Sequence, residues 1–274
     1  MRAPALLALI ALAPASLPAQ DVQLRFRPPA GRVATTATVT EMVMRGGPMA
    51  GFVTHPDSPM TRVTAFQTST VTAVGDGEYT EEQIIDSARM EFPAAPQFAA
   101  MMEQMGDLMA GTSTVSRMST RGRLLAVQMT PSPALAQMMG AMGQGGGPLT
   151  MGTSQVSSPS LWLLPEDAVR VGATWRDSVV VALDSSGVAG GEFRMAATYQ
   201  LRAHQGSVAT IGFDGVYAVT GPDLPPGVSF VVTGEVRLDL ARGRLAAMAM
   251  EMTGSMPLPP GEIPIEVRTR IVAR

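Results

Sequence analysis

Apolar and polar residues alternate with a period of two along most of the chain from Gln23 onward. Such alternation places one set of side chains on each face of a β-strand. The stretches 235–240 and 262–270 show it, with Ile263, Ile265 and Val267 predicted to face inward. In the stretch 192–202 the predicted inward face consists of Phe193, Met195, Ala197, Tyr199 and Leu201. Strands with one apolar and one polar face predict antiparallel pairing.

The early strands carry threonine at alternate positions, where the later strands carry charged residues. These threonines are Thr36, Thr38 and Thr40 in one segment and Thr64, Thr68, Thr70 and Thr72 in the next. Threonine is β-branched and suits a strand that is only partly buried. We expect all of them on the outer face of the sheet.

Turn signals divide the chain into two similar halves. Gly75-Asp76-Gly77 and His204-Gln205-Gly206 both predict tight hairpins, because glycine accepts positive φ. The sequence Arg-Gly-Arg-Leu occurs at 121–124 and again at 242–245, each time before an alternating run. Aligning 32–44 with 171–183 and 61–92 with 193–219 predicts a duplicated meander, with chance similarity of β-rich text as the alternative.

The predicted fold class is mainly β (α+β): a duplicated antiparallel meander that forms a strongly curved sheet or half-barrel. Residues 20–274 would form a single β-rich domain of two repeats, about 23–157 and 160–274. Two short Met-rich helices are predicted as insertions in the first half.

The first predicted helix covers 95–109 and the second follows Ser132, which can cap it, and Pro133, which suits its first turn. A glycine run at 143–147 would end the second helix. Apolar residues recur on both helices at helical spacing. They are the predicted ligand-binding residues: Phe98, Met101, Met102, Met105, Met109, Leu135, Met138, Met139 and Met142.

A comparison of sizes favours a ligand at this place. About twelve strands make a sheet nearly 60 Å wide, and two helices of about 10 Å diameter cover about a third of it. The remaining apolar face either closes on itself or stays open for a hydrophobic small molecule or lipid, and flexible methionines suit varied ligands. Plain core packing and a Cu(I) site of thioethers are the alternatives for the methionines, the latter disfavoured because the chain has no Cys. We expect no cofactor and no resident metal.

The N-terminus and the composition bear on location. Met1-Arg2, an apolar run at 5–13 and small residues up to Ala19 predict a removable signal peptide, 1–19, and hence a periplasmic or secreted protein. No apolar run is long enough for a transmembrane anchor. The 20 basic residues, all arginine, against 23 acidic residues make nucleic acid an unexpected partner. No protein partner is identified.

Catalytic signals are weak, and we expect a protein that is not an enzyme. No nucleophile elbow, phosphate loop or metal-binding His-Glu-x-x-His helix occurs. His55 and His204 are expected in exposed loops. The acidic residues Glu78, Glu81, Glu82 and Asp86 are expected on a solvated face of one hairpin.

The segment 161–175, Leu-Trp-Leu-Leu-Pro-Glu-Asp-Ala-Val-Arg-Val-Gly-Ala-Thr-Trp, opens the second half. Its Pro, Val-x-Val-Gly, Trp pattern resembles a family of uncharacterised secreted bacterial proteins, from the 26–31 start to the C-terminus. The resemblance implies no activity. Gly172 is expected to make a turn, and Trp162 and Trp175 to anchor the connection in the core.

In overall plan the chain is similar to periplasmic lipoprotein carriers and lipid-binding lipoproteins, without matching residues. That likeness concerns architecture only and does not establish function. The comparison of sheet and helix sizes is what makes a carrier of a hydrophobic ligand the expected function. The competing expectation is a structural or partner-binding exported protein with a closed core.

Overall fold

The computed structural model describes residues 21–44, 58–141, 163–182, 192–220, 228–258 and 261–273. Eleven strands form one antiparallel sheet, in the order β5-β4-β3-β2-β1-β11-β10-β9-β8-β7-β6. The elements are β1 (Val33–Met44), β2 (Thr61–Gly75), β3 (Glu78–Glu91), a 3₁₀ turn (Pro96–Phe98), α1 (Ala99–Met109), β4 (Ser113–Ser119), β5 (Leu124–Thr130), α2 (Pro133–Ala141), β6 (Thr174–Ala182), β7 (Glu192–Gln205), β8 (Val208–Thr220), β9 (Ser229–Asp239), β10 (Arg244–Leu258) and β11 (Gly261–Ala273).

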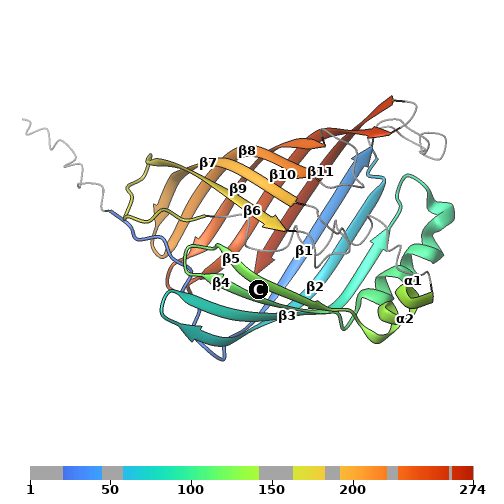
Figure 1. Ribbon diagram of the computed structural model, residues 1–274, viewed down its shortest axis with the longest axis horizontal. Helices are drawn as coiled ribbons and strands as arrows, with labels where there is room; N and C mark the ends of the chain where they lie inside the picture. Colours follow the sequence, from blue (N-terminus) through green and yellow to red (C-terminus); the bar gives the residue numbers. More distant parts are fainter. Residues whose placement is uncertain are drawn as a thin grey trace, which may run out of the picture.

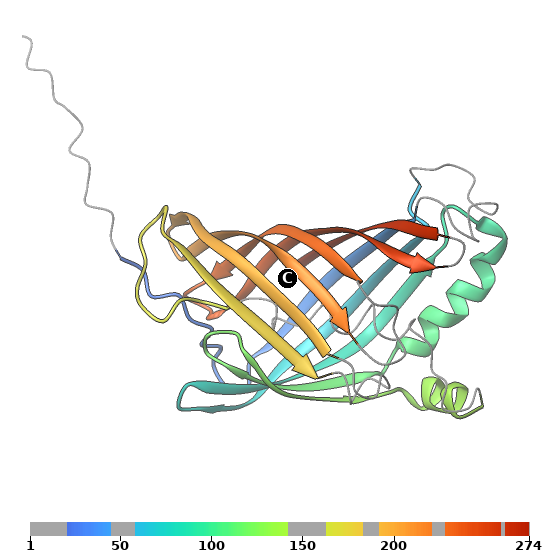
Figure 2. The same ribbon diagram turned by 45° about the horizontal axis from the view of Figure 1, so that its top comes forward.

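The sheet is strongly curved and does not close (Figures 1 and 2). Strands β1 and β11 pair in its middle, and β5 and β6 are its two edges. The predicted mainly β class, the curved antiparallel sheet and the two short helices are confirmed. Strong curvature follows from the right-handed twist that each added strand contributes.

Both halves of the chain run as consecutive meanders. Strands β1 to β5 pair in sequence order on one side, and β6 to β10 do so on the other. The two Arg-Gly-Arg-Leu corners join β4 to β5 and β9 to β10, and both corner glycines, Gly122 and Gly243, have positive φ. Among the described strands, β11 has no counterpart in the first half, and it connects the halves by pairing with β1.

The N-terminal segment, residues 21–28, closes one end of the sheet and touches both corners. The Phe26 amide donates to the Thr120 carbonyl at 2.7 Å, and the Arg27 amide donates to the Gly243 carbonyl at 2.9 Å. The side chain of Arg121 donates to the Leu164 carbonyl at 2.8 Å. It also forms ion pairs with Glu166, which precedes β6, and with Asp177, which is in β6. These contacts hold together strands from opposite edges of the sheet that do not pair with each other.

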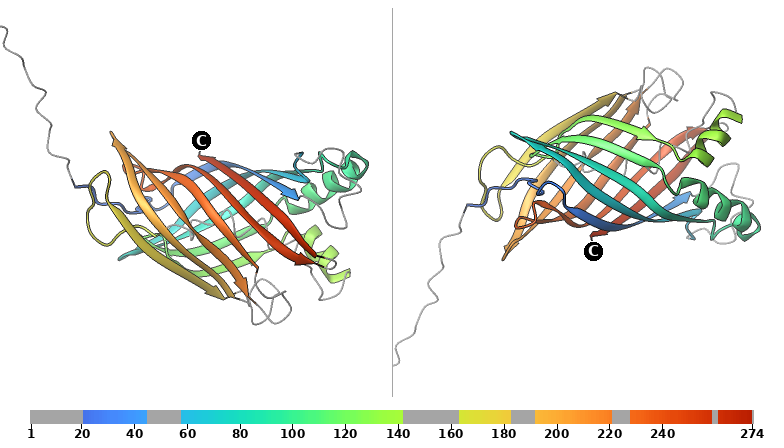
Figure 3. Two further views of the ribbon diagram at one scale, coloured as in Figure 1. Left: turned by 90° about the horizontal axis from the view of Figure 1, so that it is seen from above. Right: turned by 90° about the horizontal axis from the view of Figure 1, so that it is seen from below.

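The helices lie at the opposite end of the sheet from the N-terminal segment (Figure 3). Strand β4 pairs with β3 only as far as Ile84, and α1 packs beside the part of β3 that follows. Gly106 of α1 makes this approach possible, because a Cβ there would lie 2.5 Å from the Ala88 carbonyl oxygen. The helix thus covers a strand edge that would otherwise be unpaired.

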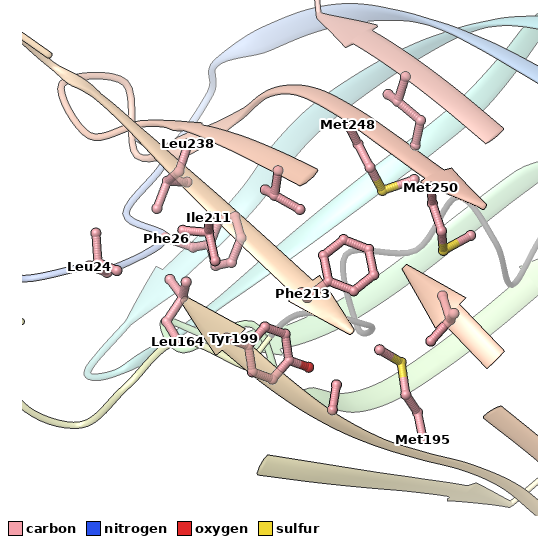
Figure 4. Packing of buried hydrophobic residues seen from close by; sticks show 14 of the residues in the cluster. Leu24, Phe26, Leu164, Met195, Tyr199, Ile211, Phe213, Leu238, Met248 and Met250 are labelled. Carbon is pink, nitrogen blue, oxygen red and sulfur yellow. The ribbon is translucent and has the colours of Figure 1, made fainter. Parts of the chain in front are cut away.

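The core lies inside the curve of the sheet. Side chains from β7, β8, β9 and β10 point into it, together with Leu24 and Phe26 of the N-terminal segment and Leu164 (Figure 4). Met195, Ala197, Tyr199 and Leu201 are buried, so the inward face predicted for 192–202 is confirmed for these four residues. Ile263 and Ile265 are also buried, as predicted.

The prediction for the first group of threonines is wrong. Thr36, Thr38 and Thr40 share the inner face of β1, and Thr38 is only 6% exposed. The register explains this placement, since Thr38 pairs with Ala65 on one side and Ile271 on the other, and both of these are buried. Polar residues of β1 therefore face the interior.

Candidate functional site

One row of paired inner-face residues crosses the second half of the sheet and shows how the interior changes character. It begins with stacked aromatic rings, Trp175 on Tyr199 with centroids 5.6 Å apart, and continues to Phe213, which pairs with Gly234. From β6 to β1 the row runs through Trp175, Tyr199, Phe213, Gly234, Met250, Thr269 and Thr40. It is apolar as far as β10 and polar from β11 onward.

A second, neighbouring row changes one strand later, between Ile271 of β11 and Thr38 of β1. From β7 to β1 it runs through Leu201, Ile211, Val236, Met248, Ile271 and Thr38. The interior therefore has an apolar wall on β7 to β10, here taken as Met195, Tyr199, Ile211, Phe213, Val232, Val236, Met248, Met250 and Met252. Opposite, on β1 to β3, lies a wall that also contains the buried Ala65, Val71 and Tyr79. Its polar residues, here called the polar wall, are Thr36, Thr38, Gln67, Ser69, Glu81 and Gln83.

A cavity of about 70 Å³ lies against the polar wall, at the end of the sheet that the N-terminal segment closes. Phe26 and Pro28 of that segment form one side of it, and Arg244 and Leu245 of the second corner form another. Ile271 of β11 also lines it, so the cavity borders the hydrophobic core.

Glu81 places a carboxyl group in this cavity. Its side chain accepts hydrogen bonds from Ser69 and Gln83, both of the polar wall. Burial raises the pKa of Glu81 above its ordinary value of 4.5, against the lowering effect of these two hydrogen bonds and of Arg244. The expected solvated position of Glu81 is wrong, whereas Glu78 and Asp86 of the same hairpin are exposed as expected.

Arg244 places a guanidinium group in the same cavity. Burial lowers its pKa, and the charges of Arg32 and Arg242 lower it further. Its Nη1 is buried and has no hydrogen-bond partner among the described residues. The hydroxyl of Thr38 is buried in the same wall and also has no partner there.

We predict that replacing Glu81 with glutamine makes the stability of the protein less sensitive to pH. A raised carboxyl pKa in the folded state gives stability that is fully present below about 4.5 and is lost as pH rises through the folded pKa. Glu81→Gln should therefore unfold at higher denaturant concentration than the parent at about pH 7, with the difference shrinking toward about pH 4. The Glu81 carboxyl faces Tyr79 and Arg244, and these two residues are the same in Glu81→Gln and in the parent.

The control for this measurement is Glu78→Gln, which removes an exposed carboxylate from the same strand. A gap between Glu81→Gln and the parent that stays constant with pH would contradict the prediction.

The predicted ligand-binding residues gather at the other end of the sheet, away from the cavity. Met102 is buried against β3, while Met101 is 52% exposed and Phe98, Met105, Met109, Leu135 and Met138 are half-buried. The Ser132 hydroxyl joins the two helices, since it accepts from the Leu135 amide at 3.1 Å and donates to the Leu108 carbonyl at 2.5 Å. The Met139 side chain and Met142 lie outside the described part of the structure.

Sequence reasoning named the methionines of the helices as ligand-binding residues but not those of the apolar wall, although it placed Met195 on an inward face. Met195, Met248, Met250 and Met252 are buried inside the sheet. The signal was present as Met-x-Met-x-Met at 248–252, where every second residue points inward. The cavity residues Thr38, Glu81 and Arg244 had no such signal, because each looks like an ordinary outward position in a strand or turn.

Neither the histidines nor the acidic side chains of the described residues indicate a metal site. His204 is half-buried at the end of the β7–β8 hairpin, where it pairs with Ala209, and His55 is outside the described residues. Among the described residues, no group of three or more His, Asp or Glu side chains could hold a metal ion. None of the described helices has the length and apolarity needed to span a bilayer.

No protein-family model matches the chain, and the comparison with curated proteins gave no match. A solved structure with a similar course is described as showing lipid–protein interactions in lipovitellin, with 10% sequence identity and a TM-score of 0.42. The match covers 91% of this chain but 25% of that one, so the chain spans about a quarter of its length. A structural similarity this low carries no argument about function, so the function is argued from the residues of the site.

Proposed function

We propose that the protein is an exported, non-enzymatic binding protein that holds an amphiphilic, lipid-like ligand inside its curved sheet. The observation that carries the proposal is the division of the interior into an apolar wall and a polar wall. A ligand with an apolar chain and a polar head would match both walls at once. Export is proposed from the signal-like residues 1–19, which lie outside the described structure.

The division of the interior is not what a purely structural core requires. A core that serves only stability gains from apolar residues on both walls, because each buried polar group must find a hydrogen-bond partner. Here Thr38 and Arg244 each leave a buried polar atom without one among the described residues. Binding sites commonly combine an apolar lining with a few polar groups that orient the ligand.

The methionines of the apolar wall support binding as well. Their unbranched side chains change rotamer easily, so the wall can adjust to chains of different shape. Met42, Met44 and Val267 are half-buried and pack against the core, which extends the apolar surface onto β1 and β11. Ligand specificity would then come mainly from the polar wall.

The test is to extract the full-length protein from its producing cells with organic solvent and to identify bound molecules by mass spectrometry. In parallel, a dye that fluoresces in apolar surroundings is titrated into delipidated protein. The variant Met42→Gln with Val267→Thr changes two paired inner-face residues with little change in volume. It should weaken dye binding at least about tenfold, because one hydroxyl or amide in an apolar contact costs about 1–3 kcal/mol.

Val272→Thr is the matched control, since Val272 is on the outer face of β11 and 52% exposed. It should leave dye binding unchanged. Equal binding by the inner-face variant and this control would place any apolar ligand outside the sheet and refute the proposal.

A closed-core structural protein is the second candidate. It is favoured by the burial of the apolar wall, where Met195, Phe213 and Met248 expose almost no surface. The two candidates differ in one result, because a closed core would yield no extracted ligand and no dye signal from folded protein.

A further inference from the structure

The cavity at the second corner holds two buried polar atoms that lack a partner among the described residues. They are Nη1 of Arg244 and the hydroxyl of Thr38. A buried donor without a partner costs about 1–3 kcal/mol, and more when it is charged. More than about 90% of buried polar groups in native proteins find partners. Two exceptions lining one cavity indicate that a group from outside the chain completes them.

The charge around Arg244 favours an anion. Its neighbours are two further arginines, Arg32 and Arg242, and two carboxyl groups, Asp239 and Glu81. Asp239 is already engaged, since it accepts from the Ala241 and Arg242 amides at 3.1 Å and pairs with the Arg242 side chain at 3.5 Å.

Glu81 is engaged as well, since it accepts hydrogen bonds from Ser69 and Gln83. Arg242 and Asp239 pair with each other and are not among the residues that line the cavity, so the guanidinium groups of Arg32 and Arg244 share it with the one carboxyl group of Glu81. The cavity keeps an excess of positive charge.

The size of the cavity limits the anion. Its volume of about 70 Å³ is several times the roughly 10–15 Å³ that one ordered water needs. It is far below the roughly 300 Å³ of a pocket that encloses a whole drug-sized ligand. A small planar head fits, and Ile271, which lines the cavity, leads from it to Met248 of the apolar wall.

We propose that this cavity binds the carboxylate of a single-chain amphiphile, with Arg244 as its ion-pair partner and Thr38 as a hydrogen-bond donor. A carboxylate has two oxygens, one for the free guanidinium nitrogen and one for the hydroxyl. The apolar chain would lie along the apolar wall. This inference rests on the proposed function and names the class of ligand.

The experiment compares three probes by calorimetry on delipidated full-length protein: dodecanoate, its methyl ester and acetate. Dodecanoate should bind at least about tenfold more tightly than the ester, the effect of one charge-assisted hydrogen bond of about 1.5–3 kcal/mol. Acetate should bind far more weakly than dodecanoate, because it lacks the chain. Arg244→Gln should remove the preference for the acid over the ester, and Thr38→Val should reduce it severalfold.

Arg242→Gln is the matched control, because Arg242 lies in the same corner, is exposed and pairs with Asp239. It should keep the preference. Arg244→Lys retains the positive charge without the planar guanidinium fork, so it should keep part of the preference for the acid over the ester. This variant replaces Arg244→Gln in the test if Arg244→Gln does not fold.

Each contrary result has a separate meaning. Equal binding of acid and ester, unchanged in Arg244→Gln, overturns this inference and leaves the proposed function standing. Binding of neither long-chain probe overturns both. If acetate binds as tightly as dodecanoate, the assignment of an amphiphilic ligand is wrong. If a crystal structure with dodecanoate shows only ordered water in the cavity, the assignment of the cavity as the carboxylate site is wrong.

Discussion

Gly243→Ala is expected to lower the free energy of unfolding by about 2–5 kcal/mol, the sum of a backbone and a packing effect. Gly243 has a φ of +62°. Residues other than glycine adopt such a positive φ at a cost of about 1–2 kcal/mol. An added Cβ would also overlap the backbone of Arg27. Displacing Arg27 breaks its hydrogen bond to the Gly243 carbonyl and loosens the N-terminal segment that closes the sheet.

Gly206→Ala separates the two effects. Gly206 has a φ of +58° and no atom within 4 Å of the position of a Cβ. It should therefore lose only about 1–2 kcal/mol, the backbone part. Both variants are compared with the parent by denaturant unfolding. Equal losses would mean that the contact between the corner and the N-terminal segment adds nothing to stability.

Phe213→Ala is expected to cost about 3–5 kcal/mol, which is the upper range for removing a buried aromatic side chain. The Phe213 ring lies over Gly234 of the neighbouring strand, close enough that a Cβ on Gly234 would overlap it. Glycine has no side chain that could move into the space left by the ring. The ring also contacts Tyr199, with centroids 6.4 Å apart.

Val216→Ala is the control for Phe213→Ala on the same strand. Val216 is on the outer face of β8 and 50% exposed, so its truncation should cost no more than about 0.5 kcal/mol. If both variants unfold at the same denaturant concentration, the apolar wall is not the stabilising core that the burial of its residues indicates.

The pairing of large rings with glycines recurs in the apolar wall. Phe230 lies beside Gly254 in the same way that Phe213 lies over Gly234. The sequence contains all four residues, but their sequence separation hides the relation, which arises only from the register of β8, β9 and β10. No local pattern identifies which glycine lies under which ring.

Local patterns predicted the strands, hairpins and helices well. The alternation at 192–202 corresponds to β7, the Gly75-Asp76-Gly77 turn joins β2 to β3, and Ser132 caps α2. Each of these depends on neighbouring residues only, through side-chain alternation, positive φ at Gly77 or a cap three residues from its amide partner. The same locality allowed the two Arg-Gly-Arg-Leu corners to be matched.

The sequence by itself determined the strand periodicity, the turns, the two helices and the mainly β class, because these follow from short-range backbone preferences. Only the tertiary structure decided which polar residues face inward. Thr38, Glu81 and Arg244 come from β1, β3 and β10, and they meet in one cavity because β11 pairs with β1 and brings the second half beside the first. A polar residue in an alternating strand is assigned to solvent by default, and only long-range pairing can show that the opposite side is the interior.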